Sequence, residues 1–445
     1  MLQIQFSARI VKSFSSLSAL PSSTVAFSTL QELAANHKGL AKVILKKGKT
    51  QLFKDGSPMV YSGAVDRIIG RPPPITGDVV LVADGSEKPI GWGLYNSTSM
   101  FCVRLMQLED EAIRDASCAL DVEKLLERRL DDALKLRRSL GLPSADTNAY
   151  RLVNSEGDRL SGLIVDVFGD IAVVASSAAW VEKYRPAIES SIGRINAISH
   201  INWRPSIDIL KEEGLNVSNL KNFKACSHLE KVKVIENGIF YSVSLEGQKT
   251  GFYADQRENR SLIHSISKRL RVLDVCCYSG GFALNAAAGG ADDVIGIDSS
   301  LPALELAKEN AQLNNFDPGR VSFLKEDAVE FMKKAVSQKK MWDLVILDPP
   351  KLAPRRKVLQ SASGMYRSLN SLAMQITKRG GLLMTCSCSG AMTQSGLFLR
   401  TLQGAATMAG RKITVLRHAG AACDHPIDPS YPEGAYLTNY LLRVL

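Results

Sequence analysis

The chain has 445 residues, and 55 lysine and arginine side chains against 45 aspartates and glutamates give it a net charge of +10. No apolar stretch reaches the roughly 20 residues that a membrane-spanning helix needs, and the eight cysteines form no CxxC pairs. We therefore expect a soluble chain of several domains with reduced thiols, without a membrane segment, a disulfide framework or a metal site. The basic charge agrees with a polyanionic partner.

The first segment, residues 1–40, differs in composition from the rest of the chain. Between Met1 and Leu30 there are eight serines, two threonines and two basic residues, and the first acidic residue is Glu32. A serine-rich, acid-poor and weakly basic start is typical of organellar transit peptides. We expect a transit peptide outside the fold, and the hydroxyl content favours a chloroplast over a mitochondrion. A tail without any targeting role is the alternative.

Short strands separated by turns are predicted over residues 42–108. Runs such as Phe101–Leu105 alternate with turn signals rich in glycine, proline and aspartate. This pattern predicts a small all-β domain. Its cluster of Lys46, Lys47 and Lys49 is a candidate RNA-binding site, with a merely solvated charged face as the alternative.

The central segment, residues 109–245, mixes both kinds of element. A helix is predicted over 121–140, strands over 162–167 and 171–175, and a second helix over 181–192. We expect a compact α+β domain with a linker helix and find no candidate for chemistry within it.

Strands and helices alternate over residues 246–445. Strands are predicted at 271–276, 293–298, 321–325, 342–347 and 381–386. Helices such as 302–314 and 361–377 lie between them, and two added strands are expected near 413–416 and 435–445. Repeating βα units predict an α/β, Rossmann-like domain with a doubly wound, mostly parallel sheet.

Acidic residues follow successive strands of this sheet, and glycines occupy the first βα turn. The cofactor-binding candidates from these positions are Asp274, Tyr278, Ser279, Gly280, Gly281, Asp298 and Asp327. Asp298 is placed to bind ribose hydroxyls, and Asp327 to accept from an adenine amine. Because the turn lacks the full dinucleotide fingerprint, a nucleoside cofactor without phosphates fits better, and S-adenosylmethionine is the obvious candidate. An α/β domain of another function is the alternative.

Asp348-Pro349-Pro350 follows the next strand. Methyltransferases that act on nitrogen in a planar base often have an acid or asparagine before two prolines here. The prolines stiffen a loop whose carbonyls and carboxylate can meet the edge of a base. The cations that come after it are candidates for binding RNA phosphates, with a solvated loop as the alternative. They are Lys351, Arg355, Arg356 and Lys357.

Two cysteines, Cys386 and Cys388, stand at the end of the last predicted parallel strand. Carbon 5 of cytosine is a poor nucleophile until a thiolate adds to carbon 6. Cys388 lies just past the strand, near a helix predicted from about Met392, and a helix amino terminus favours a thiolate. We therefore expect Cys388 to be the nucleophile and Cys386 to be buried inside the strand.

These motifs resemble those of the bacterial large-subunit ribosomal RNA (cytosine-5-)-methyltransferase I family. The resemblance covers residue 42 to the terminus and rests on segments 248–260, 278–282, 348–351, 387–390, 424–426 and 431–434. It implies a PUA domain at residues 42–108, a central α+β domain, and a class I methyltransferase domain that binds S-adenosylmethionine. The expected product is 5-methylcytosine, formed through a covalent adduct of Cys388 with carbon 6. Asp348 is expected to contact the cytosine and, like Gln256, the cofactor.

PUA domains commonly bind RNA, which favours the lysine cluster as an RNA contact. The transit-like extension departs from bacterial members and suggests a plant or algal organellar version. Lys351 stands where many RNA cytosine-5 methyltransferases have a second cysteine, so the residue that drives release of the enzyme stays open. The alternatives are methylation of an adenine or guanine nitrogen and a non-catalytic RNA-binding assembly factor. The target nucleotide and the formation of a homodimer also stay open.

Overall fold

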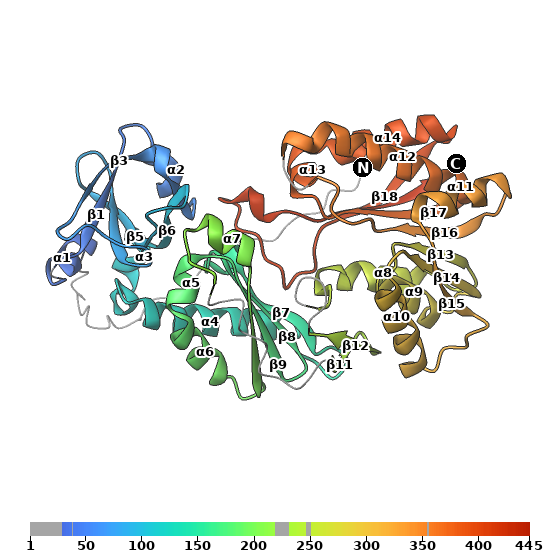
Figure 1. Ribbon diagram of the computed structural model, residues 1–445, viewed down its shortest axis with the longest axis horizontal. Helices are drawn as coiled ribbons and strands as arrows, with labels where there is room; N and C mark the ends of the chain where they lie inside the picture. The colour runs from blue at the N-terminus through green and yellow to red at the C-terminus, as the bar shows by residue number, and fades with distance from the viewer. Residues whose placement is uncertain (1–28, 38, 219–230, 246–250, 354–355) are drawn as a thin grey trace, which may run out of the picture.

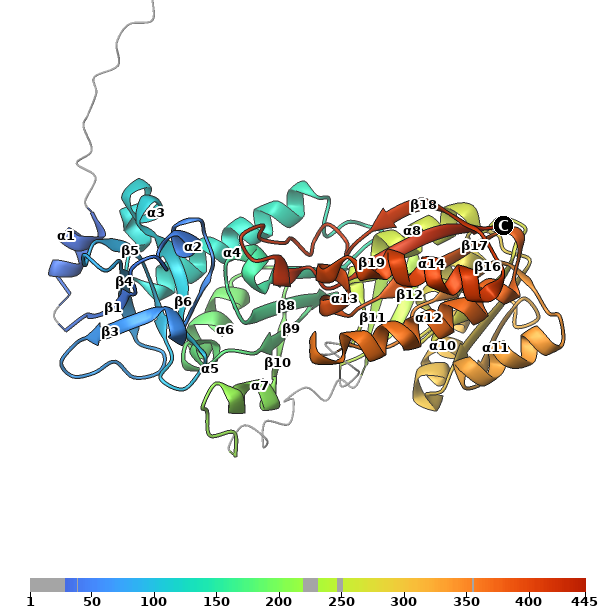
Figure 2. The same ribbon diagram turned by 90° about the horizontal axis from the view of Figure 1, so that it is seen from above.

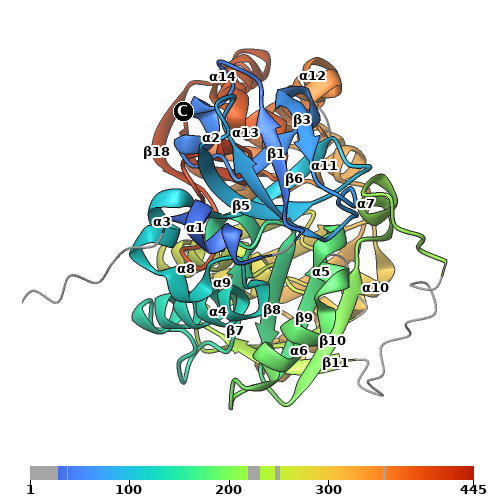
Figure 3. The same cartoon turned by 90° about the vertical axis from the view of Figure 1, so that its left-hand side faces the viewer.

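The computed structural model describes residues 29–37, 39–218, 231–245, 251–353 and 356–445 (Figure 1). A β domain, a central domain and a C-terminal α/β domain follow one another along the long axis. Figure 3 looks along this axis from the β domain and shows the other two behind it. Among the described helices, none combines the length and the apolar character that crossing a bilayer requires.

The N-terminal domain is the all-β domain that the sequence predicts, and its six strands form one sheet. Its strands are β1 Ala41–Leu45, β2 Met59–Tyr61, β3 Val65–Ile69, β4 Val79–Ala83, β5 Pro89–Tyr95 and β6 Phe101–Leu108. They are ordered β2-β6-β5-β4-β1-β3, with the short helix α2 Gln51–Lys54 after β1. Val43, Val80 and Val103 are fully buried in the domain's core.

The folded part of the chain includes a helix within the segment that we expected to lie outside the fold. Helix α1, Leu30–Ala35, is capped by the Thr29 side chain, which accepts from Glu32 N at 3.2 Å. Leu30 is fully buried in a hydrophobic cluster with Trp92 of β5. The apolar side of α1 therefore packs onto the N-terminal domain, whereas residues 1–28 and 38 of the expected transit segment lie outside the described residues.

The central domain packs helices against a sheet ordered β10-β9-β8-β7. Its elements are α3 Glu109–Arg114, α4 Val122–Ser139, β7 Ala149–Asn154, β8 Leu163–Phe168, β9 Ile171–Ser176, α5 Ala179–Lys183, α6 Arg185–Gly193, β10 His200–Pro205 and α7 Ile207–Glu212. The single helix predicted over 181–192 is wrong, because Tyr184 separates α5 from α6. Pro186 explains the break, since proline lacks the N–H that a continuous helix would need.

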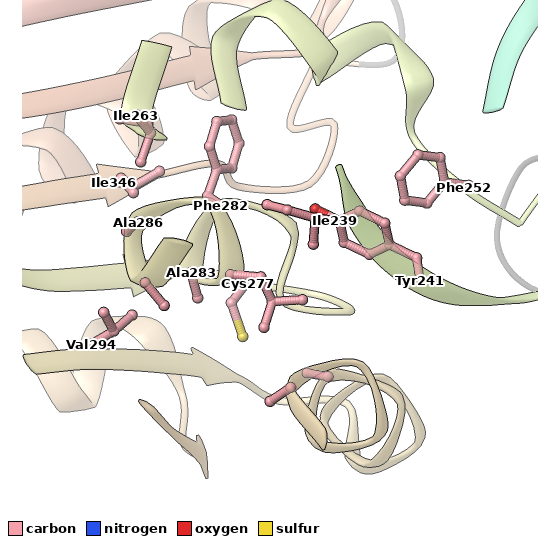
Figure 4. Packing of buried hydrophobic residues seen from close by; sticks show 14 of the residues in the cluster. Ile239, Tyr241, Phe252, Ile263, Cys277, Phe282, Ala283, Ala286, Val294 and Ile346 are labelled. Carbon is pink, nitrogen blue, oxygen red and sulfur yellow. The ribbon is translucent and has the colours of Figure 1, made fainter. Parts of the chain in front are cut away.

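A hairpin of β11 Lys231–Glu236 and β12 Ile239–Ser244 joins the central sheet to the last domain. Ile239 and Tyr241 of β12 lie in one hydrophobic cluster with Phe282 of the last domain (Figure 4). Phe168 of β8 belongs to the same cluster. The domain boundary expected at residue 245 therefore falls inside a shared core.

The C-terminal domain is a doubly wound α/β sheet, as predicted. Its elements are α8 Arg257–Ile266, β13 Arg271–Val275, α9 Gly281–Ala288, β14 Asp293–Asp298, α10 Leu301–Leu313, β15 Val321–Lys325, α11 Ala328–Ser337, β16 Trp342–Leu347, α12 Leu359–Ile376, β17 Thr377–Ser387, α13 Gly390–Ser395, α14 Leu397–Ala409, β18 Ile413–Ala419 and β19 Thr438–Val444. The order is β15-β14-β13-β16-β17-β19-β18. Strands β13 to β17 are parallel, and the two added strands pair antiparallel, β19 with β17 and β18 with β19.

Alternating side chains of the sheet are buried on its two faces. Val272 of β13 packs with α8, α9 and α10, whereas Leu273 and Val275 pack with α11, α12 and α14. Successive strands are added on one side of β13 as far as β15 and then on its other side from β16 onward, so the strand order reverses between β13 and β16. The crevice beyond the carboxyl ends of these strands is the usual ligand site of such sheets.

Residues 420–437, which connect β18 to β19, return to the other two domains; we refer to them as the strap (Figures 1 and 2). Asn154 Nδ2 of β7 donates to Pro426 O at 2.8 Å. Ser430 Oγ donates to Gly56 O of the N-terminal domain at 2.8 Å. The strap therefore contacts all three domains.

Candidate functional site

A cavity of about 440 Å³ opens beyond the carboxyl ends of strands β13 to β17. It brings together eight of the ten predicted catalytic and cofactor-binding residues, although they are far apart in the sequence. Those on its wall are Gln256, Tyr278, Ser279, Gly281, Asp298, Asp327, Asp348 and Cys388. The parallel arrangement explains this grouping, because each of these strands ends at the same edge of the sheet.

Asp298, at the end of β14, is tied to the first βα turn. Its Oδ2 accepts from Tyr278 N at 2.9 Å, and its Oδ1 accepts from Ser300 N at 2.9 Å. The turn needs glycine at position 280, where φ is +83° and an added Cβ would lie 3.0 Å from the Phe323 ring. A half-buried carboxylate thus stands beside backbone amides on the cavity wall.

Asp274 and Gly280 are not on the cavity wall. Asp274 is fully buried beneath the turn, and its Oδ2 accepts from Ala283 N, the third residue of α9, at 2.9 Å. Burial raises the pKa of this carboxyl to about 8. Asp274 lies within β13, and its side chain is directed into the interior. Asp274 and Gly280 therefore shape the turn and do not line the space that a ligand would occupy.

Asp327 has a structural function that the sequence analysis did not assign. Its exposed side chain caps α11, with Oδ1 accepting from Val329 N at 2.9 Å and from Glu330 N at 3.0 Å. Aspartate before a helix is a preferred N-cap. Asp327 still lines the cavity together with Glu326.

Asp348, directly after β16, is held by Gln256. Gln256 Nε2 donates to Asp348 Oδ2 at 3.2 Å. Asn259 Nδ2 donates to Gln256 Oε1 at 2.7 Å, so the orientation of the glutamine amide is fixed from its other end. This contact joins the turn before α8 to the Asp348-Pro349-Pro350 loop.

The two cysteines at the end of β17 have different environments. Cys388 is half-buried on the cavity wall, and its Sγ lies 3.9 Å from Pro349 O. Cys386 is fully buried inside β17, as expected, and its Sγ accepts from Asn439 Nδ2 at 2.9 Å. Burial raises the pKa of Cys386 well above its usual value. Only Cys388 of this pair therefore reaches a ligand in the cavity. The helix expected from about Met392 is short and begins at Gly390.

The cavity wall also contains residues to which the sequence pattern gives no role. They are Phe252, Tyr253, Asp255, Arg260, Ser300, Leu352, Leu369 and Leu437. The rings of Tyr253 and Tyr278 meet edge to face with centroids 5.2 Å apart. Burial and the neighbouring Tyr278, Asp255, Asp348 and Cys388 raise the pKa of Tyr253, so its phenol is neutral. The alternation of strands and helices predicts strand ends but not the loops that fold over them.

The candidate RNA-binding residues fall into two groups. Lys351 is exposed directly after Asp348-Pro349-Pro350, and Lys357 is exposed in the short segment before α12. Arg355 lies outside the described residues, and Arg356 begins a short 3₁₀ helix, Arg356–Val358. The other group, Lys46, Lys47 and Lys49, is exposed between β1 and α2 in the N-terminal domain.

The cavity fits a nucleoside cofactor with a cationic sulfur. Its volume lies within the range of about 300–1,000 Å³ that is usual for small ligands. Apolar side chains of Ile297, Leu352 and Leu369 suit a planar base, and the carboxylate of Asp298 suits hydroxyl donors. Among the described residues, no group of three or more histidines, cysteines and acids is arranged to hold a metal ion.

Comparison with known protein families agrees with this geometry. A family described as S-adenosylmethionine-dependent methyltransferase matches residues 215–415, and a PUA-like domain matches residues 43–108. The structure of SMU.776 complexed with SAH has a TM-score of 0.74 at 21% identity and covers 90% of this chain and 99% of that one. This likeness shows a shared fold. The cofactor of the chain is S-adenosylmethionine.

Similar curated proteins extend over nearly the whole chain. Ribosomal RNA large subunit methyltransferase I of Alteromonas mediterranea is 36% identical over 406 residues, 91% of this chain and 99% of the relative. The protein of the same name from Tolumonas auensis is 35% identical over 405 residues, again 91% and 99%. The Escherichia coli protein is 31% identical over 407 residues, with the same coverage. The chain therefore belongs to the ribosomal RNA large subunit methyltransferase I family.

Proposed function

We propose that this protein methylates carbon 5 of a cytosine in large-subunit ribosomal RNA, with Cys388 as the nucleophile. The names of its relatives support ribosomal RNA as the substrate. The observation that carries the choice of carbon 5 is the position of Cys388 on one cavity wall with Asp298 and Asp348. A methyltransferase acting on a base nitrogen has no need of a thiol there.

Asp298 and the turn Tyr278–Gly281 hold the nucleoside part of the cofactor in this proposal. Bound there, S-adenosylmethionine supplies an electrophilic methyl group. The acidic wall formed by Asp298, Asp327 and Asp348 favours a cationic ligand by charge.

The Cys388 thiolate adds to carbon 6 of the cytosine, and the new S–C6 bond makes carbon 5 nucleophilic. Carbon 5 then takes the methyl group, while the bond between the methyl carbon and the sulfur of the cofactor breaks and leaves its electron pair on the sulfur. Carbon 5 still carries its own hydrogen at this point. A base removes that proton, the electrons of the C5–H bond restore the C5–C6 double bond, and the S–C6 bond breaks to return the thiolate. Asp348 binds the edge of the base while its carboxylate is oriented by Gln256.

The target base has to leave the RNA stack to reach Cys388. Sequence-specific RNA recognition commonly targets unpaired bases that splay out of the strand. The exposed Lys351 and Lys357 follow the loop that lines the cavity and are suited to hold the neighbouring phosphates. The lysines of the N-terminal domain bind a second stretch of the RNA.

The test is methyl transfer from labelled S-adenosylmethionine to ribosomal RNA, with nucleoside analysis of the product. Wild type is compared with Cys388→Ala and with Cys386→Ala, whose buried thiol is off the cavity wall. We expect labelled 5-methylcytidine from wild type and Cys386→Ala, and none from Cys388→Ala. RNA that contains 5-fluorocytidine should trap a covalent adduct with wild type, because fluorine cannot be removed as a proton.

Two results would contradict the proposal. A methylated purine made equally well by Cys388→Ala would establish a nitrogen methyltransferase that uses the Asp348-Pro349-Pro350 loop. Absence of transfer to any ribosomal RNA, with RNA binding retained, would establish an assembly factor.

We also propose that the protein works in an organelle, preferentially the chloroplast, on organellar ribosomal RNA. The serine-rich, acid-poor composition of residues 1–28 supports this proposal. A fluorescent protein fused behind residues 1–40 should enter chloroplasts in plant cells, and a fusion from residue 29 onward should stay outside. Cytosolic fluorescence from both fusions would rule out targeting by this segment.

A further inference from the structure

The strap binds the turn Asp255–Gln256 and Arg257, the first residue of α8, at several points. Ala422 N donates to Asp255 O at 2.8 Å, and Tyr436 Oη donates to Asp255 Oδ2 at 2.7 Å. Asp424 accepts from both ends of the Arg257 guanidinium, at 3.0 Å from Nη1 and 2.7 Å from Nη2. The backbone of this turn and the side chains on both sides of Gln256 are therefore held by one segment.

Asp424 also binds the central domain. Its backbone carbonyl accepts from Arg137 Nη2 of α4 at 2.9 Å, and its Oδ2 accepts from Arg151 N of β7 at 2.8 Å. The side chains of Asp424 and Arg137 are fully buried, and that of Arg257 is 6% exposed. Hydrogen bonds to ionised groups are stronger than neutral ones, and they are less screened when buried. Asp424 thus joins α4 and β7 to the start of α8.

The bound turn forms part of the cavity. Asp255 and Gln256 are on its wall, and Gln256 Nε2 donates to Asp348 Oδ2. A shift of Arg257 moves the neighbouring Gln256, and with it the donor that orients the Asp348 carboxylate. A short chain of contacts therefore runs from the central domain through Asp424, Arg257 and Gln256 to the cavity.

We propose that Asp424 is a positioning residue for methyl transfer, which orients Asp348 through Arg257 and Gln256 and ties that orientation to the docking of the central domain. The inference rests on methyl transfer in this cavity, whichever base accepts the methyl group. Asp424 is fully buried and is not on the cavity wall, so its side chain touches neither the cofactor nor the RNA. Its removal should therefore change the catalytic step more than the affinity for RNA.

The test compares Asp424→Asn and Asp424→Glu with a matched control, Glu213→Gln. Glu213 is also a buried carboxylate between two domains, where Oε1 accepts from Arg104 Nη2 at 3.1 Å and Oε2 accepts from Asn96 Nδ2 at 3.1 Å. It is not on the wall of the catalytic cavity. Both amide variants lose a buried charge, so a general loss of stability should be shared by the two.

Steady-state kinetics with ribosomal RNA should be measured well below the melting temperature of each variant. For Asp424→Asn we expect kcat to fall about tenfold to a hundredfold, in the range known for small misplacements of reacting groups, with KM for RNA within about threefold of wild type. Asp424→Glu should regain part of kcat, because it restores the charge opposite Arg257. Glu213→Gln should keep kcat within about threefold.

Equal losses of kcat in Asp424→Asn and Glu213→Gln would overturn the inference, as would a loss confined to KM. If Asp424→Asn does not fold, Arg257→Lys decides, because it keeps a positive charge opposite Asp424 and loses the paired hydrogen bonds of the guanidinium; a kcat at the wild-type value would overturn the inference. Nucleoside analysis of the wild-type product keeps the two proposals apart, because a methylated purine would end the cytosine proposal and leave the kcat comparison valid. Absence of transfer by wild type would overturn both.

Discussion

The hydroxyl of Tyr366 lies 3.0 Å from Ser389 Oγ, immediately after Cys388 in the chain. The same hydroxyl accepts from Ser387 Oγ at 3.0 Å, so one side chain of α12 contacts both neighbours of the cysteine. Ser389 Oγ in turn accepts from Ala353 N at 3.0 Å. The loop after β16 and the loop after β17 are therefore connected by buried residues that are not on the cavity wall.

Tyr366→Phe should release this connection without creating a large cavity. We expect kcat to fall about tenfold and stability to fall by about 1–3 kcal/mol, since two buried serine hydroxyls lose a partner. Tyr440→Phe is the control, because the Tyr440 ring contacts the same Phe398 ring. Among the described residues, no hydrogen bond of the Tyr440 hydroxyl is found. Kinetics and thermal unfolding of both variants check the prediction. Equal activity in the two would show that the loops hold Cys388 without Tyr366.

Asp298→Asn should weaken binding of S-adenosylmethionine. The variant keeps an acceptor for Tyr278 N but loses the charge at the end of β14, so we expect the dissociation constant to rise about tenfold, with RNA affinity unchanged. Asp293→Asn is the matched control at the other end of the same strand. Titration calorimetry with S-adenosylhomocysteine measures both. An unchanged affinity in Asp298→Asn would remove this carboxylate from the cofactor site.

Asp274 should make the protein less stable as the pH rises from about 4 to 8. An aspartate in the unfolded chain has a pKa near 3.9, whereas burial raises that of Asp274 to about 8. Between these values the folded state keeps a proton that the unfolded state has lost, so the free energy of unfolding falls with pH by at most about 1.4 kcal/mol per unit.

Asp274→Asn retains an acceptor for Ala283 N and cannot ionise, so this part of the pH dependence should vanish. Urea denaturation at several pH values between about 5 and 8 compares the two proteins. Parallel curves for wild type and variant would mean that Asp274 is ionised in the folded state.

Replacement of Lys351 and Lys357 by alanine should raise KM for RNA about threefold to tenfold. The slope of the logarithm of the binding constant against the logarithm of the salt concentration should become shallower by about one to two, because about one counterion is released for each phosphate contact. Lys339 and Lys340 offer a matched control, since they are exposed before the start of β16, whereas Lys351 follows its end. The double variant of the control pair should bind RNA like wild type. Equal weakening in both would indicate a general effect of net charge.

The sheet and the strand ends could be predicted from the sequence because both depend on local patterns. Apolar runs before Asp298, Asp348 and Cys388 predict buried strands, and the carboxyl ends of parallel strands share one edge. The position of Cys386 inside β17 follows from the same pattern, since it lies two residues before Cys388 and within the apolar run.

The contacts that hold the site could not be predicted in this way. Asp274 pairs with Gly296, two positions before Asp298, and only packing shows that its side chain is directed away from the cavity. Asp424 meets Arg257 across 167 positions of the chain. No local periodicity encodes such a pair, because both residues lie outside regular strands or at their margins.

The position of the strap in the sequence also determines when, during synthesis of the chain, the cavity can form. Ribosomes synthesise proteins from the amino terminus, and domains generally fold as units as they emerge. Residues 420–437 and strand β19, which lies between β17 and β18, are synthesised after all the other strands of this sheet. Until that stretch is released, the β domain and the central domain have no link to the methyltransferase sheet through Asp424 or Ser430. Completion of the cavity is thus a late event, so a nascent chain stalled before residue 420 should be unable to modify RNA.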